Sequence, residues 1–343
     1  MRLGQSGKRK GGAAAGQDLE ADGWDRMKGL TVAVLNDAAL AAALGKKGTV
    51  SDISFFNFKK GDIGVAYVHP SRYPEKLQSL ANALAMADAA VLVVEKLDKE
   101  LGELIVALDA FGITRGFMIL KNYLSADQLR PFVAGTTLEE FRFHDLDAYQ
   151  INEDFAAMEI PPVEGKVRVP VDHFFDVKGV GTVALGSVRR GVSRQHDELQ
   201  VWPTAKRAIV RSIQVHDEDV PEAPYGCRVG LALKGIEATD LFRGAILAPA
   251  DSLKAPENIE TDFSASKYWK GTISKGMTIH GACGLQIVPM HVEEAPADGV
   301  KPGKTGMVVF KLDRPLAFDR GDRLVALDLD SKGLRIAGWG PCP

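Results

Sequence analysis

The spacing of hydrophobic and polar positions changes near residue 165 of this chain. Before that point, short apolar runs at residues 30–35, 89–94 and 116–120 predict buried strands. Between these runs, apolar residues recur at i, i+3, i+4 and i+7 within residues 74–84 and 101–108, which predicts helices. Strands and helices that alternate in this way are typical of an α/β domain with a mostly parallel sheet.

Two local patterns add detail to this first domain. Residues 53–58 and 63–68 are rich in β-forming side chains and flank a KKGD turn, so they predict an antiparallel hairpin. Ser125 and Gln128 have the spacing of a capping box, which predicts the start of a helix. Pro131 must shorten or kink that helix, because proline lacks the N–H that the helix interior needs.

The rest of the chain predicts β-structure. A stiff, turn-rich PPVEG segment at residues 161–165 ends the first domain. Short apolar runs between turns then predict a small closed barrel, at residues 182–185, 208–215, 229–233 and 245–247. After a second boundary at residues 250–258, similar runs predict a third, all-β unit, at residues 267–269, 277–280, 285–288, 305–312 and 323–327. The predicted domains are residues 28–165, 166–250 and 255–343.

Residues 1–27 have few large apolar side chains, and a segment of that kind cannot offset the entropy lost on ordering. We interpret them as a flexible basic tail. The KRK cluster at residues 8–10 is interpreted as part of a solvated arm rather than as an RNA contact.

Composition and charge restrict the kind of protein. The chain has 343 residues, of which 45% are hydrophobic, and this is enough for two or three globular domains. It contains neither a run of apolar residues long enough to span a membrane nor the apolar segment of a secretory signal, so we expect a cytoplasmic protein without membrane contact. Residues 31–165 carry 12 basic and 19 acidic side chains, which makes this domain a poor attractor of nucleic acid or phosphate.

The potential metal ligands are dispersed. Three cysteines without a C-x-x-C pair argue against a disulfide framework or a thiolate zinc site, and a reducing compartment is expected. The seven histidines occur singly. We therefore expect no metal and no cofactor. No H-x-x-x-H or G-x-S-x-G motif is present, and we assign no catalytic residue.

Four ordered blocks in residues 179–247 carry a family resemblance. They read GVGTV at 179–183, RSIQ at 211–214, RVGLALKGI at 228–236 and RGAIL at 243–247. In order and spacing they resemble the second, β-barrel domain of translational GTPases such as elongation factor Tu and the selenocysteine-specific elongation factor. PGKTG at 302–306, GDRL at 321–324 and RIAGWG at 335–340 are similar to the third domain of the same family. The resemblance implies a P-loop-GTPase-like α/β domain followed by two β-barrels of the elongation factor type.

The motifs that bind GTP in this family are absent here. A phosphate loop, G-x-x-x-x-G-K-[ST], should follow the first strand, because its backbone N–H groups and lysine hold the β- and γ-phosphates. Instead Leu35 is followed by Asn36 and Asp37 and then by an Ala-rich run without glycine or lysine. The first strand is expected to lead directly into a helix, with a carboxylate where phosphates would lie.

The other two GTPase motifs have lost their functional residues. The D-x-x-G position corresponds to VHPS, with Val68 in place of aspartate and Ser71 in place of glycine. The N-K-x-D position corresponds to LKNY, with Leu120 in place of asparagine and Tyr123 in place of the aspartate that reads guanine. We expect no nucleotide to bind, and the first domain is degenerate. His69 is not expected to act as a catalytic base, because no phosphate loop lies beside it.

The preferred hypothesis is a translation elongation factor-like pseudo-GTPase that binds tRNA, rRNA or the ribosome. In the family the second barrel contacts the aminoacyl end of tRNA, and the matching positions here are Asp172, His173, Phe175 and Lys234. An acidic residue of the family's pocket is replaced by Cys227. A basic set on the same barrel adds further candidates for RNA contact, including Arg189, Arg190, Arg207 and Arg211.

Two alternatives remain open at this point. The chain could be a protein-interaction or regulatory module without RNA binding, in which a partner docks on the degenerate, acidic front domain. It could also be a divergent but active GTPase. The sequence favours each of these less than the pseudo-GTPase hypothesis.

Overall fold

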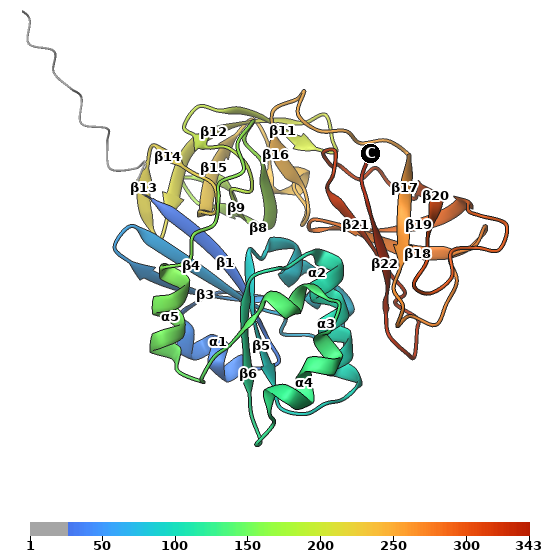
Figure 1. Ribbon diagram of the computed structural model, residues 1–343. Coiled ribbons are helices and arrows are strands. Elements are labelled where there is room, and N and C mark those ends of the chain that lie inside the picture. Colours follow the sequence, from blue (N-terminus) through green and yellow to red (C-terminus); the bar gives the residue numbers. More distant parts are fainter. Residues whose placement is uncertain (1–26) are drawn as a thin grey trace, which may run out of the picture.

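The computed structural model describes residues 27–343. The predicted basic tail, apart from Met27, lies outside the described residues, and so does its KRK cluster. The described chain forms three units, an α/β unit drawn in blue and green, a barrel in yellow and green, and a barrel in orange and red (Figure 1). This is the predicted fold class, and the structure confirms it.

The α/β unit is built on a seven-stranded sheet with the order β2-β3-β4-β1-β5-β6-β7. Strands β1, β4, β5, β6 and β7 pair in parallel, while β2, β3 and β4 pair antiparallel. The mostly parallel sheet and the hairpin of β3 and β4 are as predicted, whereas β2 adds a second antiparallel pair that the sequence pattern does not predict. The strands are β1 (Lys28–Leu35), β2 (Lys46–Val50), β3 (Ser54–Lys60), β4 (Ile63–His69), β5 (Ala89–Val94), β6 (Gly116–Leu120) and β7 (Arg142–Phe143).

Helices cover both faces of this sheet, and alternate residues of each strand point to opposite faces. Val32 and Val34 of β1 pack with α1 and α5, whereas Ala33 and Leu35 pack with α2, α3 and α4. Because the second half of β1 is buried on both faces, residues 32–35 are apolar without interruption. The helices are α1 (Ala38–Leu44), α2 (Leu77–Met86), α3 (Lys99–Phe111), α4 (Ala126–Val133) and α5 (Ala148–Ala156), with a short 3-10 helix η2 (Thr137–Glu140).

The helix predictions hold with small corrections. Helix α2 begins at Leu77 rather than at Pro74, because residues 71–75 form a turn. The capping box of Ser125 and Gln128 is present, and α4 ends two residues after Pro131. The pattern did not predict β2, β7 or α5, because β2 is lysine-rich, β7 has two residues and α5 has mixed polarity.

The second unit is a closed barrel. Its ring has the order β11-β16-β8-β9-β15-β12, and pairing between β11 and β12 closes it. The ring strands are β8 (Val169–Val177), β9 (Gly181–Ser187), β11 (Glu198–Trp202), β12 (Arg207–Val215), β15 (Arg228–Lys234) and β16 (Ile246–Ala248). Smaller elements beside them are β10 (Ser193–Arg194), β13 (Glu218–Val220), β14 (Glu222–Ala223) and a 3-10 turn η3 (Ala238–Asp240).

The third unit is also a closed barrel, with the order β17-β20-β19-β18-β21-β22. Its strands are β17 (Asn258–Ala265), β18 (Thr278–Cys283), β19 (Gln286–Glu294), β20 (Thr305–Leu312), β21 (Arg323–Leu327) and β22 (Ile336–Pro341). The strand predicted at residues 267–269 is wrong. These residues form a turn, and their apolar character is explained by Trp269, which is 2% exposed and fills the barrel core. The apolar runs also did not predict β17 or β22.

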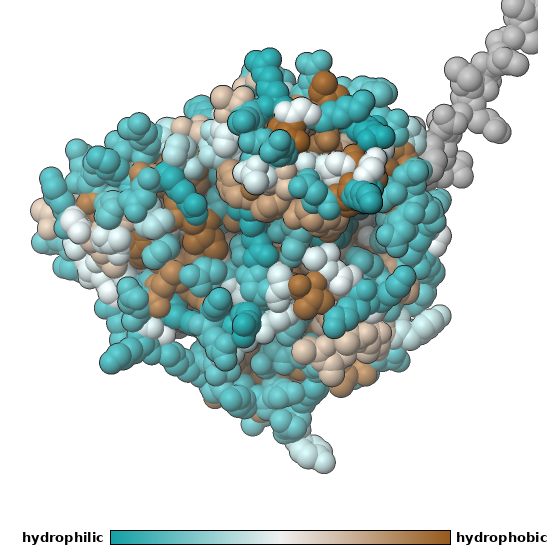
Figure 2. Space-filling model, turned by 180° about the vertical axis from the view of Figure 1, so that it is seen from behind, coloured by the Kyte–Doolittle hydropathy of each residue, from teal (hydrophilic) through white to brown (hydrophobic). Residues whose placement is uncertain are grey.

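The third barrel packs directly on the α/β unit. Leu285, Val325 and Ile336 of the barrel belong to the same apolar cluster as α2 and α3. Seen from behind, the molecule is hydrophilic over most of its surface, with apolar side chains gathered in separate patches (Figure 2). Within residues 27–343, no helix is long and apolar enough to cross a membrane.

Candidate functional site

The connection from β1 to α1 occupies the place of the phosphate loop. Only Asn36 and Asp37 separate the last residue of β1 from the first residue of α1, whereas the phosphate-loop motif itself is eight residues long. Asn36 adopts a positive φ of 67° and donates from its side-chain amide to the Val93 carbonyl at 3.0 Å. The Asp37 carboxylate caps α1 by accepting from the Leu40 N–H at 2.8 Å. The strand leads almost directly into the helix, as the sequence predicts.

Lys121, from the N-K-x-D position, is held by two carboxylates. Its Nζ lies 2.6 Å from Oδ2 of Asp37 and 3.1 Å from Oε1 of Glu95. Burial alone would raise the pKa of the Asp37 carboxyl, but the hydrogen bond and charge of Lys121 together with backbone N–H groups lower it below its ordinary value. The same pairs raise the pKa of Lys121. Both side chains are therefore charged and engaged with each other at neutral pH.

The polar side chains at the other two GTPase motifs either form hydrogen bonds within the protein or are exposed to solvent. At the end of β4, which includes Val68, the His69 Nδ1 lies 2.9 Å from the Val34 carbonyl, and burial lowers the pKa of this ring. The Ser71 hydroxyl contacts the Ser54 hydroxyl at 2.6 Å. Beyond β6, which ends at Leu120, Tyr123 has a positive φ of 61° and is fully exposed, so it points to solvent.

On the second barrel, Asp172 is held by partners within the barrel, and His173 reaches the front unit. Asp172 is 1% exposed and accepts two hydrogen bonds from the Arg228 guanidinium, at 2.7 and 2.8 Å. Burial opposes ionisation, but Arg228 and His173 hold the pKa of the Asp172 carboxyl below its ordinary value. The His173 Nε2 lies 3.0 Å from the Ser51 hydroxyl of the α/β unit. Both residues thus have protein partners, Asp172 within its barrel and His173 across the interface.

Arg189 and Arg190 are likewise occupied between units. The Arg189 Nη1 lies 2.7 Å from Oδ1 of Asp88, whose side chain is 2% exposed. Arg190 forms an ion pair with Asp319 of the third barrel. Cys227, which replaces an acidic residue of the family, is buried, and burial raises its pKa to about 12, so the thiol stays neutral.

Four of the predicted RNA-contact residues remain at the surface. Phe175 is 44% exposed, and Arg207, Arg211 and Lys234 are exposed. They lie on β8, β12 and β15, three strands of one barrel, and Arg211 folds back to donate to the Val180 carbonyl at 3.1 Å. The structure thus divides the eight candidates into four that are buried or half-buried against protein partners and a surface set of four.

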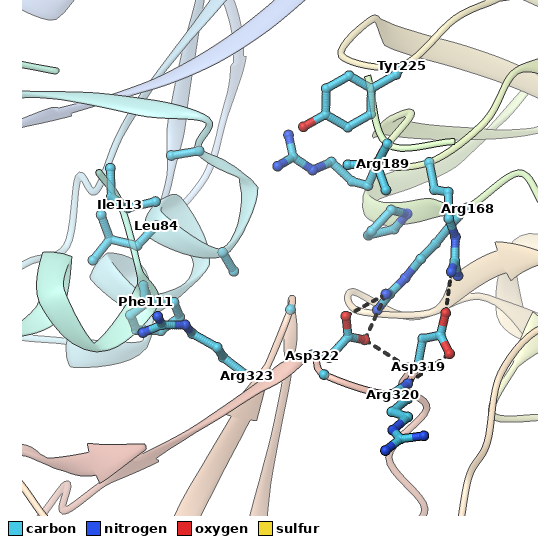
Figure 3. Close-up of a pocket in the computed structure, with 17 residues that line it drawn as sticks. Leu84, Phe111, Ile113, Arg168, Arg189, Tyr225, Asp319, Arg320, Asp322 and Arg323 are labelled. Atoms are coloured by element: carbon cyan, nitrogen blue, oxygen red, sulfur yellow. Dashed lines mark hydrogen bonds and ion pairs between the residues drawn. The ribbon is translucent and has the colours of Figure 1, made fainter. Parts of the chain in front are cut away.

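Sequence reasoning did not find the residues that meet where the three units converge. Arg168, Tyr225, Arg320 and Arg323 line a cavity there, together with Arg189 and Arg190 (Figure 3). The DRGDR segment at residues 319–323 is a signal for this site, because it gathers four charges of alternating sign around one glycine in a short loop. Among residues 27–343, no group of three or more His, Cys, Asp or Glu side chains could hold a metal ion.

Comparison with known proteins supports the family assignment. Residues 181–248 match the family of elongation factor Tu domain 2. An uncharacterized protein from Methanocaldococcus jannaschii is 39% identical over 316 residues, covering 92% of this chain and 99% of its own. The selenocysteine-specific elongation factor of the same organism is 27% identical over 333 residues, covering 86% of this chain and 71% of its own.

Comparison of the structure with solved structures agrees with the sequence comparison. The crystal structure of translation elongation factor SelB from Methanococcus maripaludis in complex with the GTP analogue GppNHp superposes with a TM-score of 0.75 at 23% identity, covering 92% of this chain and 79% of SelB. The three-unit architecture is that of the elongation factors. The chain belongs to the translational GTPase superfamily. The resemblance predicted from the blocks at residues 179–247 is confirmed.

Proposed function

We propose that this chain is a non-catalytic member of its superfamily, a pseudo-GTPase that binds tRNA, rRNA or the ribosome in the cytoplasm. The observation that carries the proposal is the two-residue connection between β1 and α1. A connection this short cannot present the series of backbone N–H groups that encloses the phosphates of GTP. The ion pair of Lys121 with Asp37 supports the same conclusion, because it places a carboxylate where phosphate oxygens would lie.

Loss of the guanine-reading aspartate supports the proposal independently. Tyr123 stands at that position, offers no carboxylate to a base and faces solvent. Each lost hydrogen bond to a charged group costs about 1.5–3 kcal/mol. Loss of the phosphate loop, the D-x-x-G aspartate and the N-K-x-D aspartate together is expected to remove the tight nucleotide affinity of the family.

Isothermal titration calorimetry with GTP and GDP in the presence of Mg²⁺ tests this part of the proposal. We expect no heat of binding at micromolar nucleotide. Binding at micromolar concentration or tighter would show a divergent GTPase and overturn the pseudo-GTPase assignment.

RNA binding is the activity we propose in place of the nucleotide switch. The surface set of Phe175, Arg207, Arg211 and Lys234 supports it, because an exposed aromatic side chain and exposed cations on one barrel suit unpaired bases and phosphates. The selenocysteine-specific elongation factor and SelB among the similar proteins are named as translation factors, which fits this activity. Filter binding with tRNA and with rRNA, over a range of salt concentrations, tests it. Salt-dependent retention is expected, and no retention at low salt would remove RNA binding.

Protein docking on the front unit is the second candidate, and one observation favours it. Several apolar side chains of this unit are exposed, five of them within residues 123–149, and exposed apolar surface of this kind often marks interaction sites. These five are Tyr123, Phe132, Phe143, Leu146 and Tyr149. Phe143 also lies on β7, an edge strand of the sheet.

Sedimentation with ribosomes separates the two candidates. If a protein contact dominates, a variant that combines Tyr123→Ser, Phe143→Ser and Tyr149→Ser should no longer sediment with ribosomes. A variant that lacks the exposed cations of the second barrel should still sediment with them. The reverse result supports RNA contact through the second barrel.

A further inference from the structure

A cavity of about 520 Å³ lies where the three units meet. Figure 3 shows its walls, with Leu84, Phe111 and Ile113 from the α/β unit on one side and Arg168, Arg189 and Tyr225 from the second barrel on another. Residues 319–323 of the third barrel complete it. Cavities of this volume commonly hold small molecules.

Guanidinium donors in this cavity lack protein partners. Arg190 pairs with Asp319 through Nη1, yet its Nε and Nη2 atoms are buried without a hydrogen-bond partner in the described part of the chain. Arg168 donates through Nη1 to Asp322 at 3.0 Å, and its Nε is buried and unpartnered in the same way. A buried donor left unsatisfied is destabilising by about 1–3 kcal/mol, and more when the group is charged. Three such atoms on two neighbouring arginines form a cluster of unsatisfied donors in the cavity wall, and an acceptor bound in the cavity would satisfy them after a small shift of these two side chains.

The charge of the lining favours an anion. Five arginines line the cavity against two aspartates, although the whole chain carries a net charge of −3. The five are Arg168, Arg189, Arg190, Arg320 and Arg323. Guanidinium groups bind phosphate through paired N–H donors in a geometry that lysine does not offer. A phosphate group therefore fits both the charge and the free donors.

The opposite wall is apolar. Leu84, Phe111 and Ile113 face the cavity from α2, α3 and the segment that follows α3. Tyr225 lies at the margin with its ring 5.6 Å from the Arg189 guanidinium, and its hydroxyl donates to Asp88 at 3.0 Å. This wall fits an aromatic or apolar ligand body attached to the anion.

We propose that the three-unit junction binds a small phosphomonoester with an aromatic body, such as a nucleotide, through Arg168, Arg190 and Arg320. This site is separate from the degenerate guanine-nucleotide site, whose residues Asn36, Asp37 and Lys121 do not line the cavity. Because all three units contribute to the walls, a bound ligand holds them together. Binding is therefore expected to raise the thermal stability of the whole chain.

The test uses the full chain with three probes, AMP, adenosine and inorganic phosphate, in calorimetry and in thermal unfolding. We expect AMP to bind more tightly than phosphate and adenosine not to bind. If none of the three binds at about 5 mM, or if adenosine binds as tightly as AMP, the proposal is overturned.

Two variants locate the site. Arg320→Gln removes a lining cation whose exposed side chain makes no ion pair among the described residues, and it should weaken AMP binding about tenfold. Ala85→Phe keeps every arginine but fills part of the cavity, and it should abolish the AMP-induced rise in melting temperature. Lys275→Gln, at an exposed cation of the third barrel that does not line the cavity, is the control and should bind as the unaltered chain does.

Unchanged AMP affinity in both Arg320→Gln and Ala85→Phe overturns the assignment of the site. The outcome is independent of the GTP titration, because a failure to bind GTP leaves the AMP test unaffected.

Discussion

The Nζ of Lys121 lies 2.6 Å from Oδ2 of Asp37, so the end of β6 is joined to the start of α1. One residue stands at the guanine-reading position and the other at the phosphate-loop position of the family. In a GTPase, a ligand connects these two regions. Here the protein's own ion pair connects them, which supports the proposal that the front unit is complete without nucleotide.

The first prediction concerns this pair. Replacing Lys121 with alanine leaves Asp37, whose side chain is 9% exposed, without its cation. We expect the free energy of unfolding to fall by about 1 kcal/mol, because the pair is partly screened by solvent. Urea denaturation measures the change. Lys270→Ala, at an exposed position, is the control and should lose almost nothing. A Lys121→Ala variant as stable as the parent would show that the pair is not needed to stabilise the front unit.

The second prediction concerns the contact between the front unit and the second barrel. Asp88 accepts from the Thr31 N–H at 2.9 Å and from the Tyr225 hydroxyl at 3.0 Å, and it pairs with Arg189. Asp88→Ala removes the carboxylate that all three groups contact, and it leaves the largely buried Arg189 without an ion-pair partner. The free energy of unfolding should fall by about 3 kcal/mol.

Urea denaturation again provides the measurement for Asp88→Ala. Glu159→Ala, an exposed carboxylate of the same unit, is the matched control. If the two variants lose equal stability, Asp88 does not hold the interface.

The third prediction is a pH dependence centred on Asp172. Its folded pKa lies below the model-compound value of 3.8, mainly because Arg228 outweighs the effect of burial. A carboxyl with a lowered pKa stabilises the fold fully above its unfolded pKa, and that stability is lost as the pH falls through the folded value. The contribution of Asp172 should therefore be constant at neutral pH and decline below about pH 4.

Comparison with Asp172→Asn measures this contribution. At pH 7 the variant should be less stable by about 3 kcal/mol, since Arg228 is left without its anion. The difference should narrow as the pH is lowered from 4 to 2. The exposed Asp127→Asn is the control and should show little difference at any pH. A gap between Asp172→Asn and the parent that stays constant down to pH 2 would contradict the prediction.

The fourth prediction concerns RNA. A variant with Arg207→Gln, Arg211→Gln and Lys234→Gln removes three exposed cations of the second barrel. RNA affinity at low salt should fall, and the slope of log K against log salt should decrease by up to about 3, about one for each phosphate contact. The control replaces three exposed cations of the front unit, Lys76, Lys96 and Arg130. Equal losses of RNA affinity in the two variants would indicate that RNA is attracted by net charge rather than bound at the second barrel.

Much of the fold could be predicted from local pattern. Residues 89–94 form a strand because six apolar residues are buried on both faces of a parallel sheet, and the sequence shows that run directly. Trp269 illustrates the limit. An apolar residue in a turn can fill a barrel core without belonging to a strand, and periodicity does not distinguish the two cases.

The site was less predictable, because its contacts join distant segments. Arg189 and Arg190 stand next to each other, and the sequence predicts an RNA contact for both. Their partners, Asp88 and Asp319, are more than 100 residues away along the chain in each direction. These charges meet only because the three units dock on one another. The spacing of residues along the sequence contains no information about that docking. The absent motifs of the GTPase, by contrast, could be seen in the sequence because each is contiguous.

The short connection at Asn36 and Asp37 has a consequence for the history of the chain. A substitution can be reversed by another substitution, but a phosphate loop cannot be rebuilt here without inserting several residues between a buried strand and the helix that follows it. Two lost aspartates, at Val68 and Tyr123, would also have to return. Under the proposed function, a lineage of this kind has no single-step route back to hydrolysis, and selection acts on what the remaining surfaces bind.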